Sequence, residues 1–383
     1  MVTRSLWRAG ILVTGFLLAG MAQGASATYK VGLVKMTTLA TLGGGDDNAF
    51  DVNNHGVIVG YSKNPNLARR AVRWQGGLIN DLGIPSSSYR SIARGLNDNG
   101  EIVGLYGDPD EYSYQAFYWS AGTGVITLNR SLYPGQPFDA FYVGMARAIN
   151  ASGVIVGSIE ASGVDGLVPY KRCYRSLPIR WDNPYATPKI LHCSEAGDGP
   201  NSASAINSDA VIAGYEYNGA SPDNGFRWKN GVTTHVPAPA LGSNPRLAGL
   251  NDTGVLVGSA NMLSTATIAI RWAGTGGSEW LGTLTGGNNS RAVDVNAQGF
   301  ITGTSEMAIE GESAVIQNRA FLFHPDFGMV ALPVPAGMDP QWTSCDGNAL
   351  NDRVKTSGII LVVGHCGPRA IKWTVKVRED ASR

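Results

Sequence analysis

The feature that most constrains the fold is a short motif, Ala-x-x-aliphatic-Asn followed by a turn and Gly-x-Ile-Val-Gly, which the chain carries in seven related copies. The first copy spans residues 49–60. The asparagine is present in every copy, at Asn53, Asn97, Asn150, Asn207, Asn251, Asn296 and Asn351, and the successive spacings are 44, 53, 57, 44, 45 and 55 residues. Periods of this length are typical of repeat arrays and propellers, because each repeat is one supersecondary unit that buries its apolar face against a neighbour.

Each copy continues into further short segments that are rich in Val, Ile, Phe, Tyr and Trp and bounded by Gly, Asn and Asp. In the first copy these are residues 70–74, which end in Trp74, and residues 78–82. Such segments predict four β-strands per unit. In five copies the first connection is Asn-x-x-Gly, which predicts a type I turn closed by a left-handed glycine.

Four antiparallel strands in about 45 residues predict one blade of a β-propeller. We therefore expect an all-β fold, a seven-bladed β-propeller. Small residues in the first strand, such as Ala49 and Ala93, suit an inner position near the axis, and the large Trp of the third strand suits the wide space between outer parts of adjacent blades. The alternative architecture is a linear β-solenoid, whose rungs are usually shorter.

The two ends of the repeat region predict closure of the ring. The seventh unit ends near Trp373 with no room for a fourth strand and turn, and residues 39–44 match residues 281–287 of an earlier unit. We expect the N-terminal segment to supply strand four of blade seven, which removes the open sheet edges of a linear array.

These motifs resemble the extracellular HAF repeat family, whose repeat reads roughly Ala-x-Asp-Ile-Asn-x-x-Gly-x-Ile-Val-Gly, then His-Ala-Phe-x-Trp, then Asp-Leu-Gly-Thr-Leu-Gly-Gly. The match covers nearly the whole chain after the N-terminal segment. The His of the second motif is replaced, where the match is cleanest, by Arg70, Gln115, Arg319 and Arg369. The resemblance implies a secreted, propeller-like repeat protein and no defined activity.

Residues 1–27 have the pattern of a secretory signal peptide, with Arg4 and Arg8 before a short apolar core and Ala25-Ser26-Ala27 as the cleavage site. Residues 28–383 are then a single propeller domain that is secreted or periplasmic. No second hydrophobic span follows, so no membrane span is expected after cleavage.

Charge limits the partners that the chain is expected to bind. Removing Arg4 and Arg8 leaves 28 basic residues against 30 acidic ones. This balance argues against nucleic acid, which usually needs a basic footprint. The expected partner is a glycan or an extracellular protein, bound through the long connections described below.

Four cysteines fall in two pairs, each within one unit. Cys173 and Cys193 belong to the third unit, and Cys345 and Cys366 flank the first two strands of the seventh. An exported chain makes disulfides plausible, and we predict Cys173–Cys193 and Cys345–Cys366. A zinc site is the alternative, although the spacing does not fit a Cys-x-x-Cys knuckle.

The excess residues of the uneven period gather in two kinds of connection, which antiparallel blades place on one face. The second-to-third-strand connections are long in units two, three and six (106–114, 158–176 and 304–318), and so are the connections that follow those units (129–144, 193–202 and 333–347). Repeat proteins commonly carry such insertions on their binding face. Aromatic and arginine side chains in them are the predicted ligand-binding residues: Tyr106, Tyr112, Tyr114, Tyr142, Tyr170, Arg172, Tyr174 and Arg175. The competing interpretation is that these aromatics pack the loops onto the blades.

The predicted function is therefore an exported, non-enzymatic recognition module. The alternative is a carbohydrate-active enzyme such as a polysaccharide lyase, which needs a base and a cation that neutralises a uronate. Its candidate catalytic residues are His192, Tyr170, Tyr174 and Arg172.

Two further patterns are a cluster of carboxylates and a recurring arginine. No cofactor is expected; Asp108, Asp110 and Glu111 are a Ca²⁺ candidate, and a solvated acidic turn is the alternative interpretation. Arg73, Arg180, Arg227 and Arg271 recur in strand three, which indicates a structural role such as pairing with Asp51 or Asp294 on strand one.

Overall fold

The computed structural model describes residues 28–380 except 86–89, 109–113, 131–141, 162–175, 193–200, 219–220, 264, 275–276, 310–314 and 342. These residues form strands β1 to β28 and one short helix, α1 (Val354–Ser357), so the predicted all-β class is confirmed. No helix within this part of the chain has the length and apolar character needed to cross a membrane.

Each repeat unit folds into consecutive antiparallel strands. The first unit forms β2 (Asp47–Val52), β3 (Ile58–Lys63), β4 (Arg69–Gln75) and β5 (Leu78–Asp81), and the second forms β6 (Arg90–Leu96), β7 (Ile102–Gly107), β8 (Gln115–Ser120) and β9 (Gly124–Thr127). The third forms β10 (Tyr142–Ile149), β11 (Ile155–Ala161), β12 (Ser176–Trp181) and β13 (Lys189–Ile190), and the fourth forms β14 (Ser202–Ile206), β15 (Ile212–Asn218), β16 (Ser221–Lys229) and β17 (Val232–Val236).

The remaining units follow the same order. The fifth forms β18 (Gly242–Leu250), β19 (Leu256–Met262), β20 (Ala266–Trp272) and β21 (Glu279–Gly282), and the sixth forms β22 (Ser290–Val295), β23 (Ile301–Ile309), β24 (Val315–His324) and β25 (Gly328–Ala331). The seventh forms β26 (Cys345–Leu350), β27 (Ile359–Cys366) and β28 (Arg369–Asp380), with α1 between its first two strands.

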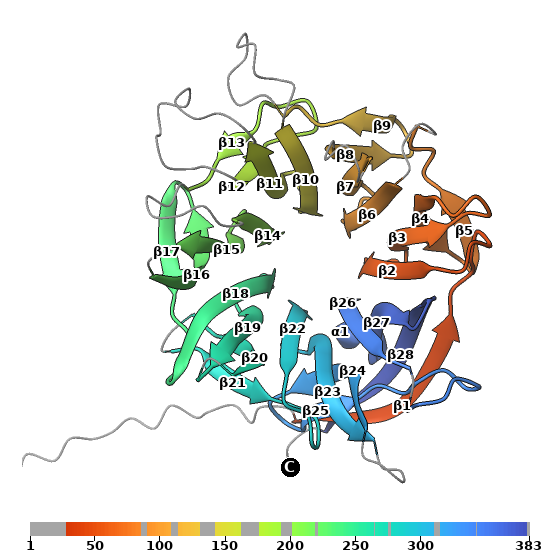
Figure 1. Ribbon diagram of the computed structural model, residues 1–383, viewed down its shortest axis with the longest axis vertical. Coiled ribbons are helices and arrows are strands. Elements are labelled where there is room, and N and C mark those ends of the chain that lie inside the picture. Colours follow the sequence, from red (N-terminus) through yellow and green to blue (C-terminus); the bar gives the residue numbers. More distant parts are fainter. Residues whose placement is uncertain are drawn as a thin grey trace, which may run out of the picture.

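The sheets lie radially around a central axis, with the first strand of every unit innermost (Figure 1). Five sheets have four strands and one has eight. The eight-stranded sheet joins the first two units through a single parallel bridge between Arg69 and Arg90. This arrangement is a β-propeller.

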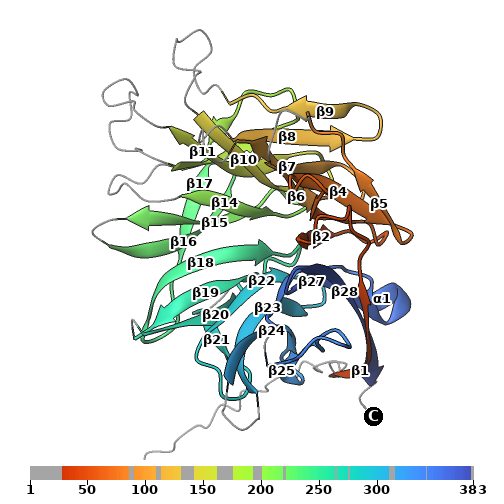
Figure 2. The same ribbon diagram turned by 45° about the vertical axis from the view of Figure 1, so that its right-hand side comes forward.

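The seventh unit takes its fourth strand from the N-terminal side of the chain. Strand β1 (Thr28–Thr38) pairs antiparallel with β28, from Thr28 opposite Asp380 to Thr38 opposite Ile371 (Figure 2). Closure by an N-terminal strand agrees with the expectation, but the segment chosen from the sequence, residues 39–44, was wrong. Those residues follow β1 as a connection toward β2: the pairing with β28 ends at Thr38, and Leu39, Ala40 and Leu42 pack against a core cluster shared by the seventh and first units.

A bulge recurs at one position of every inner strand. The register against the second strand shifts at the residue three before the motif asparagine, namely Phe50, Arg94, Arg147, Ser204, Ala248, Val293 and Asn348. Opposite the bulge, a carbonyl presses on the last glycine of Gly-x-Ile-Val-Gly: a Cβ on Gly60 would overlap the carbonyl oxygen of Asn48. This glycine is therefore needed for close approach, and not for a positive φ.

The motif asparagines link the units into a closed ring. The Nδ2 group of Asn53 donates to the carbonyl oxygen of Asn97 at 3.1 Å, and each later asparagine does the same to the next. Asn351 completes the ring by donating to the carbonyl of Asn53 at 3.5 Å. The Oδ1 atoms accept backbone N–H groups of the following turn, as Asn53 does from Val57 at 3.0 Å. The amide side chain suits this position because one planar group supplies both the Nδ2–H donor and the Oδ1 acceptor.

The turn after this asparagine has the predicted conformation. Gly56, Gly100, Gly153, Gly254 and Gly299 all have φ between 77° and 88°. In the fourth unit, which lacks the glycine, Ala210 adopts φ 55° in its place. The backbone requirement is thus kept even where the sequence departs from the motif.

The third-strand tryptophans lie between sheets, as predicted. Trp181 and Trp373 are fully buried, and their indole N–H groups donate to carbonyls of the connection that precedes their own unit, those of Asn129 and Pro333. In the first unit Trp74 donates to Ala40 at 2.7 Å. Each ring therefore fills the gap between sheets and fixes a neighbouring connection.

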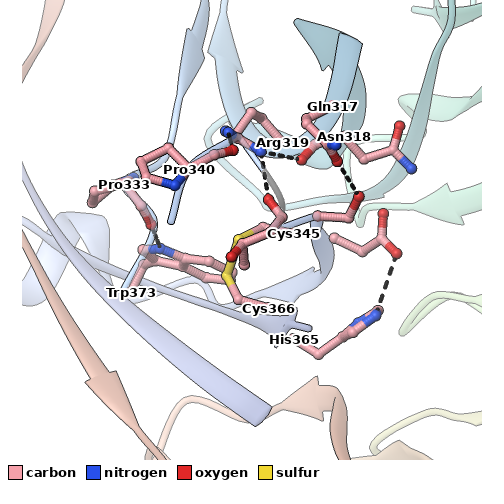
Figure 3. Close-up of a disulfide and its surroundings, with 12 residues drawn as sticks. Gln317, Asn318, Arg319, Pro333, Pro340, Cys345, His365, Cys366 and Trp373 are labelled. Carbon is pink, nitrogen blue, oxygen red and sulfur yellow. Dashed lines mark hydrogen bonds and ion pairs between the residues drawn. A yellow bond between two sulfur atoms is a disulfide. The ribbon is translucent and has the colours of Figure 1, made fainter. Parts of the chain in front are cut away.

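The Cys345–Cys366 disulfide is confirmed, and it joins directly opposed residues of β26 and β27 (Figure 3). Both cysteines are fully buried beside Trp373 in the core of the seventh unit. The other predicted bond, Cys173–Cys193, lies outside the described residues.

Candidate binding site in the central channel

The inner strands surround a cavity of about 580 Å³ on the axis of the propeller. Its walls come from β2, β6, β10, β14, β18, β22 and β26, so every unit contributes. Because these strands run in the same direction, residues at equivalent repeat positions lie at the same depth. The cavity is therefore a stack of layers, each with one residue from every unit.

The bulge residues form the layer in which the repeat varies most. All seven line the cavity: Phe50, Arg94, Arg147, Ser204, Ala248, Val293 and Asn348. A bulged residue is released from the strand ladder, so its side chain is free to differ between units. The repeat thus provides a constant scaffold and exposes its variable residues to the lumen.

One wall of this layer is basic. Arg94 and Arg147 come from neighbouring inner strands, and Arg69 and Arg90 are close enough to act on Arg94 electrostatically. Burial lowers the pKa of Arg94 to about 10, and the neighbouring charges of Arg147 and Arg90 contribute to the shift. The guanidinium of Arg94 stacks on Phe50, 4.2 Å from the ring centroid.

The cluster lacks matching negative charge. Arg69 pairs with Asp46 at 2.9 Å. Within the part of the chain that the structure describes, no carboxylate forms an ion pair with Arg94 or Arg147. The Nε atoms of Arg90 and Arg147 are buried there without a hydrogen-bond partner. Buried charges are ordinarily paired, so this wall is incomplete as it stands.

The opposite end of the channel is acidic. Asp98, Asp252 and Asp352 follow the motif asparagines of their units and line the cavity there. They cap neighbouring turns: Asp98 accepts the backbone N–H of Asn54 at 2.8 Å, and Asp252 accepts that of Ser208 at 2.9 Å. The channel is thus basic toward the start of the inner strands and acidic toward their end.

Two buried carboxyls on strand one have a linking role. Asp51 accepts the N–H of Leu96 at 2.8 Å, and Asp294 accepts that of Leu350 at 3.0 Å, so each joins two units. Burial raises the pKa of Asp51 to about 7, with a contribution from Asp294, and burial raises the pKa of Asp294 to about 6.

The predicted pairing of these carboxyls with strand-three arginines is wrong, since backbone N–H groups occupy their oxygens. Arg73 instead lies over the ring of Trp119, and Arg180 pairs with Asp182. Arg271 pairs with Glu279. These arginines remain structural, as their recurrence indicated.

The predicted loop tyrosines that can be placed belong largely to the scaffold. Tyr106 lies within β7, packs against Phe117, and bonds through its hydroxyl to Thr127 at 2.6 Å. Tyr114 is half-buried, and its hydroxyl accepts from Arg90 at 3.5 Å. Tyr142 is the first residue of β10 and not a loop residue. For Tyr106 the packing interpretation is therefore the better one, whereas Tyr114 touches the basic wall.

Most of the other predicted site residues lie outside the described part of the chain: Tyr112, Tyr170, Arg172, Tyr174, Arg175, Asp110 and Glu111. Asp108 lies within the described part, but the predicted Ca²⁺ site also needs Asp110 and Glu111. Among the described residues, no group of three or more His, Cys, Asp or Glu side chains is arranged to hold a metal ion. The expected long connection at 304–318 is mostly β23 and β24, extended into a longer hairpin.

His192, the candidate base of the alternative enzyme, lies between the third and fourth units. Its Nε2 is 3.1 Å from Oε2 of the buried Glu216, whose other oxygen is 3.3 Å from Nδ1 of His235. The sequence separates His192 from Glu216 by 24 positions and Glu216 from His235 by 19, so the cluster was not predictable. His192 and His235 are thus linked through the single carboxylate of Glu216. The cluster lies on the face of the propeller where the long connections emerge.

The basic wall was also missed from the sequence. Arg94 and Arg147 occupy the same position of the repeat, three residues before Asn97 and Asn150. The available signal was the variability of that position, which reads Phe, Arg, Arg, Ser, Ala, Val and Asn in chain order. The bulge that turns it toward the lumen has no sequence signature of its own except the glycine on the partner strand.

Comparison with known proteins supports the fold. No protein-family model matches the sequence, and no curated protein sequence matches it. The β-propeller domain of the trilobed protease from Pyrococcus furiosus, which has an open velcro topology, matches with a TM-score of 0.50 at 9% identity over 88% of this chain and 99% of that chain.

Two further solved structures are less similar. TolB from Acinetobacter baumannii has a TM-score of 0.44 at 12% identity, over 73% of this chain and 65% of that chain. The Aleuria aurantia lectin in complex with Fucα1-6GlcNAc has a TM-score of 0.40 at 10% identity, over 78% and 98%. At these identities the comparisons show the fold alone: the chain is a β-propeller protein.

Proposed function

We propose that the chain is a seven-bladed β-propeller that acts as an exported, non-enzymatic recognition module, and that its ligand binds at the basic end of the central channel. The blade count is supported by the ring of seven asparagines, and by the single bridge that joins two four-stranded units into the eight-stranded sheet. Export is supported by the signal-like pattern of residues 1–27 and by the Cys345–Cys366 disulfide.

The proposal is carried by the location of the residues that differ between repeats. The bulge layer is nearer the start of the inner strands, where the second-to-third-strand and unit-to-unit connections also emerge. Pockets that bind ligands combine a rigid, largely preformed wall with a few polar groups that converge on the lumen. Here the asparagine ring and the buried sheets provide the rigid wall, while Arg94, Arg147 and Ser204 provide the polar groups.

The experiment is a binding screen of the chain against glycans and extracellular proteins, read again after incubation for cleavage of any bound polysaccharide. We expect binding without cleavage. Unsaturated, ultraviolet-absorbing products would instead support the lyase alternative and would make His192 the first residue to mutate.

A matched pair of variants locates the site. Ser204→Trp places a large ring in the bulge layer, whereas Ala151→Trp places the same ring at the acidic end, where Ala151 lines the cavity. The first variant should lose binding and the second should keep it. Equal binding by both variants would place the ligand elsewhere.

A further inference from the structure

The arginine-lined wall of the channel carries an inference about the class of ligand, which rests on the proposed function. We infer that the channel binds the carboxylate group of an acidic saccharide, with Arg94 and Arg147 as the residues that contact it.

The first step is the excess of positive charge. Arg147, Arg90 and Arg69 all act electrostatically on Arg94, and among the described residues Arg69 is the one of these four that has an ion pair, with an Asp46 that it shares with Lys63. Arg94 and Arg147 have no ion-pair partner among the described residues, and the Nε of Arg147 is buried without an acceptor. An oxyanion in the lumen would satisfy both guanidinium groups. Arginine suits this task because its planar fork matches the two oxygens of a carboxylate.

The second step is the polarity of the channel. Asp98, Asp252 and Asp352 line the far end, so an anion is attracted to one end and repelled from the other. At the basic end, where the wall carries charge of one sign, the low-dielectric surroundings concentrate this field. A cation or a neutral ligand would gain nothing from the basic wall.

The third step is the character of the surrounding wall. The ring of Phe50 stacks on Arg94 and lines the cavity, and Tyr215 lines it beneath Arg246 at 5.4 Å. Ser204 adds a hydroxyl. Flat aromatic faces beside hydroxyl and guanidinium groups suit a sugar ring that carries a charged group. A lumen of about 580 Å³ admits a few sugar rings or a chain end, but not a folded protein.

The test is calorimetric titration of the chain with an oligogalacturonate and with its methyl ester, which has the same sugar rings without the charge. We expect the acid to bind at least about tenfold more tightly than the ester, and the difference to shrink as salt is added. Arg147→Gln and Arg94→Gln should each weaken binding of the acid about tenfold or more. Arg353→Gln, which removes the same charge from an exposed residue near the other end, is the control and should bind as wild type.

Two further anionic probes test whether the channel recognises an acidic saccharide or another kind of anion. Inorganic sulfate and poly-glutamate are titrated in parallel, and binding of either one in place of the saccharide would overturn the inference. Equal binding of acid and ester that is insensitive to both arginine variants would also overturn it, while the proposed recognition function would stand. Binding of no saccharide, with a protein found in the screen, would overturn the inference but not the proposed function.

Loss of binding is informative only if the variants remain folded. For one variant the structure predicts unchanged or increased stability. Arg147→Met removes one of several mutually repelling charges and a buried Nε without a partner. Its urea midpoint should therefore be equal to or higher than that of the wild type, although acid binding is lost. A large drop in stability would indicate that Arg147 is a structural residue, and would contradict its assignment to the ligand.

Discussion

Substitution of Asn207 by Asp tests whether the asparagine ring holds the units together through its donors. Asn207 uses Nδ2 to bond the carbonyl of Asn251 at 3.2 Å, and Oδ1 to accept the N–H of Val211 at 2.9 Å. Ionised aspartate keeps the acceptor and loses the donor. The substitution therefore removes the link to the fifth unit and leaves the turn of the fourth unit in place.

The size of the stability loss depends on which hydrogen bonds the partner atoms keep. The carbonyl of Asn251 also accepts the N–H of Gly254 at 3.1 Å, so it loses one of two bonds and is not left empty. Where the carboxyl at 207 is ionised, the loss of this donor should cost at least the net worth of one hydrogen bond, about 0.5–1.5 kcal/mol. Asn207→Ala in addition leaves the N–H of buried Val211 without its side-chain acceptor, which adds about 1–3 kcal/mol.

The pH dependence gives the sharper test. Burial should raise the pKa of an aspartate at 207, so the native variant keeps a proton that the unfolded chain releases near pH 4. The protonated carboxyl can donate to Asn251, whereas the ionised one cannot. The free energy of unfolding of the variant, relative to the wild type, should therefore fall as the pH rises from about 4 and then level off above the native pKa.

The assay is urea unfolding of wild type, Asn207→Asp and Asn207→Ala at pH 5 and pH 8. The control is Asn99→Asp, because Asn99 makes a similar bond to the carbonyl of Ala151 at 3.0 Å but is exposed. Its cost should stay within about 0.5 kcal/mol at both pH values. If Asn207→Asp matched Asn99→Asp at both pH values, the ring would not stabilise the junctions between units and the reasoning would be refuted.

Three further predictions concern the fold. The C345A/C366A double variant should lose about 3 kcal/mol of unfolding free energy in urea titrations, because the bond closes a loop between residues separated by 21 positions, and an unchanged midpoint would contradict this. Between pH 3.8 and about 7 the wild type should lose stability, since native Asp51 still holds a proton that the unfolded chain has released; D51N should flatten this part of the profile, and a profile unchanged by the substitution would exclude Asp51 as its source. Gly153→Ala should cost about 1 kcal/mol because φ is 77°, whereas Ala210→Gly, at φ 55°, should cost nothing or stabilise slightly; calorimetric midpoints check the pair, and equal losses in both would refute the turn assignment.

The fold was largely predictable because the same sequence signals for turns and strands recur along the chain. Asparagine followed three residues later by glycine specifies the turn, and the structure keeps that turn even at Ala210. Tryptophan at the end of strand three predicted a gap-filling position, which Trp181 and Trp373 occupy. The ring of side-chain bonds was not predictable, because it depends on the distance between units and not on any pattern within one.

The candidate site was predicted less well for a physical reason. Aromatic and basic residues in long connections were chosen by composition, and Tyr106 proved to be a packed strand residue. Arg94 and Arg147 were overlooked because they lie inside the first strand of their units, whereas binding residues were expected in the long connections. A bulge decides that their side chains face the lumen, and its sequence trace is a glycine on the neighbouring strand, such as Gly104 or Gly157.

The closed asparagine ring has a consequence for how the molecule comes apart. A linear repeat array has terminal units that contact one neighbour and can fray one after another. In this chain each motif asparagine bonds the next unit, and Asn351 returns to Asn53, so every unit is flanked on both sides. Opening any one unit must break two junctions at once, which makes the first opening the costly event and leaves a weakened, open-ended array behind it. Unfolding should therefore be highly cooperative. No unit is a preferred starting point for unfolding, and the remaining units should unfold together once one junction has opened.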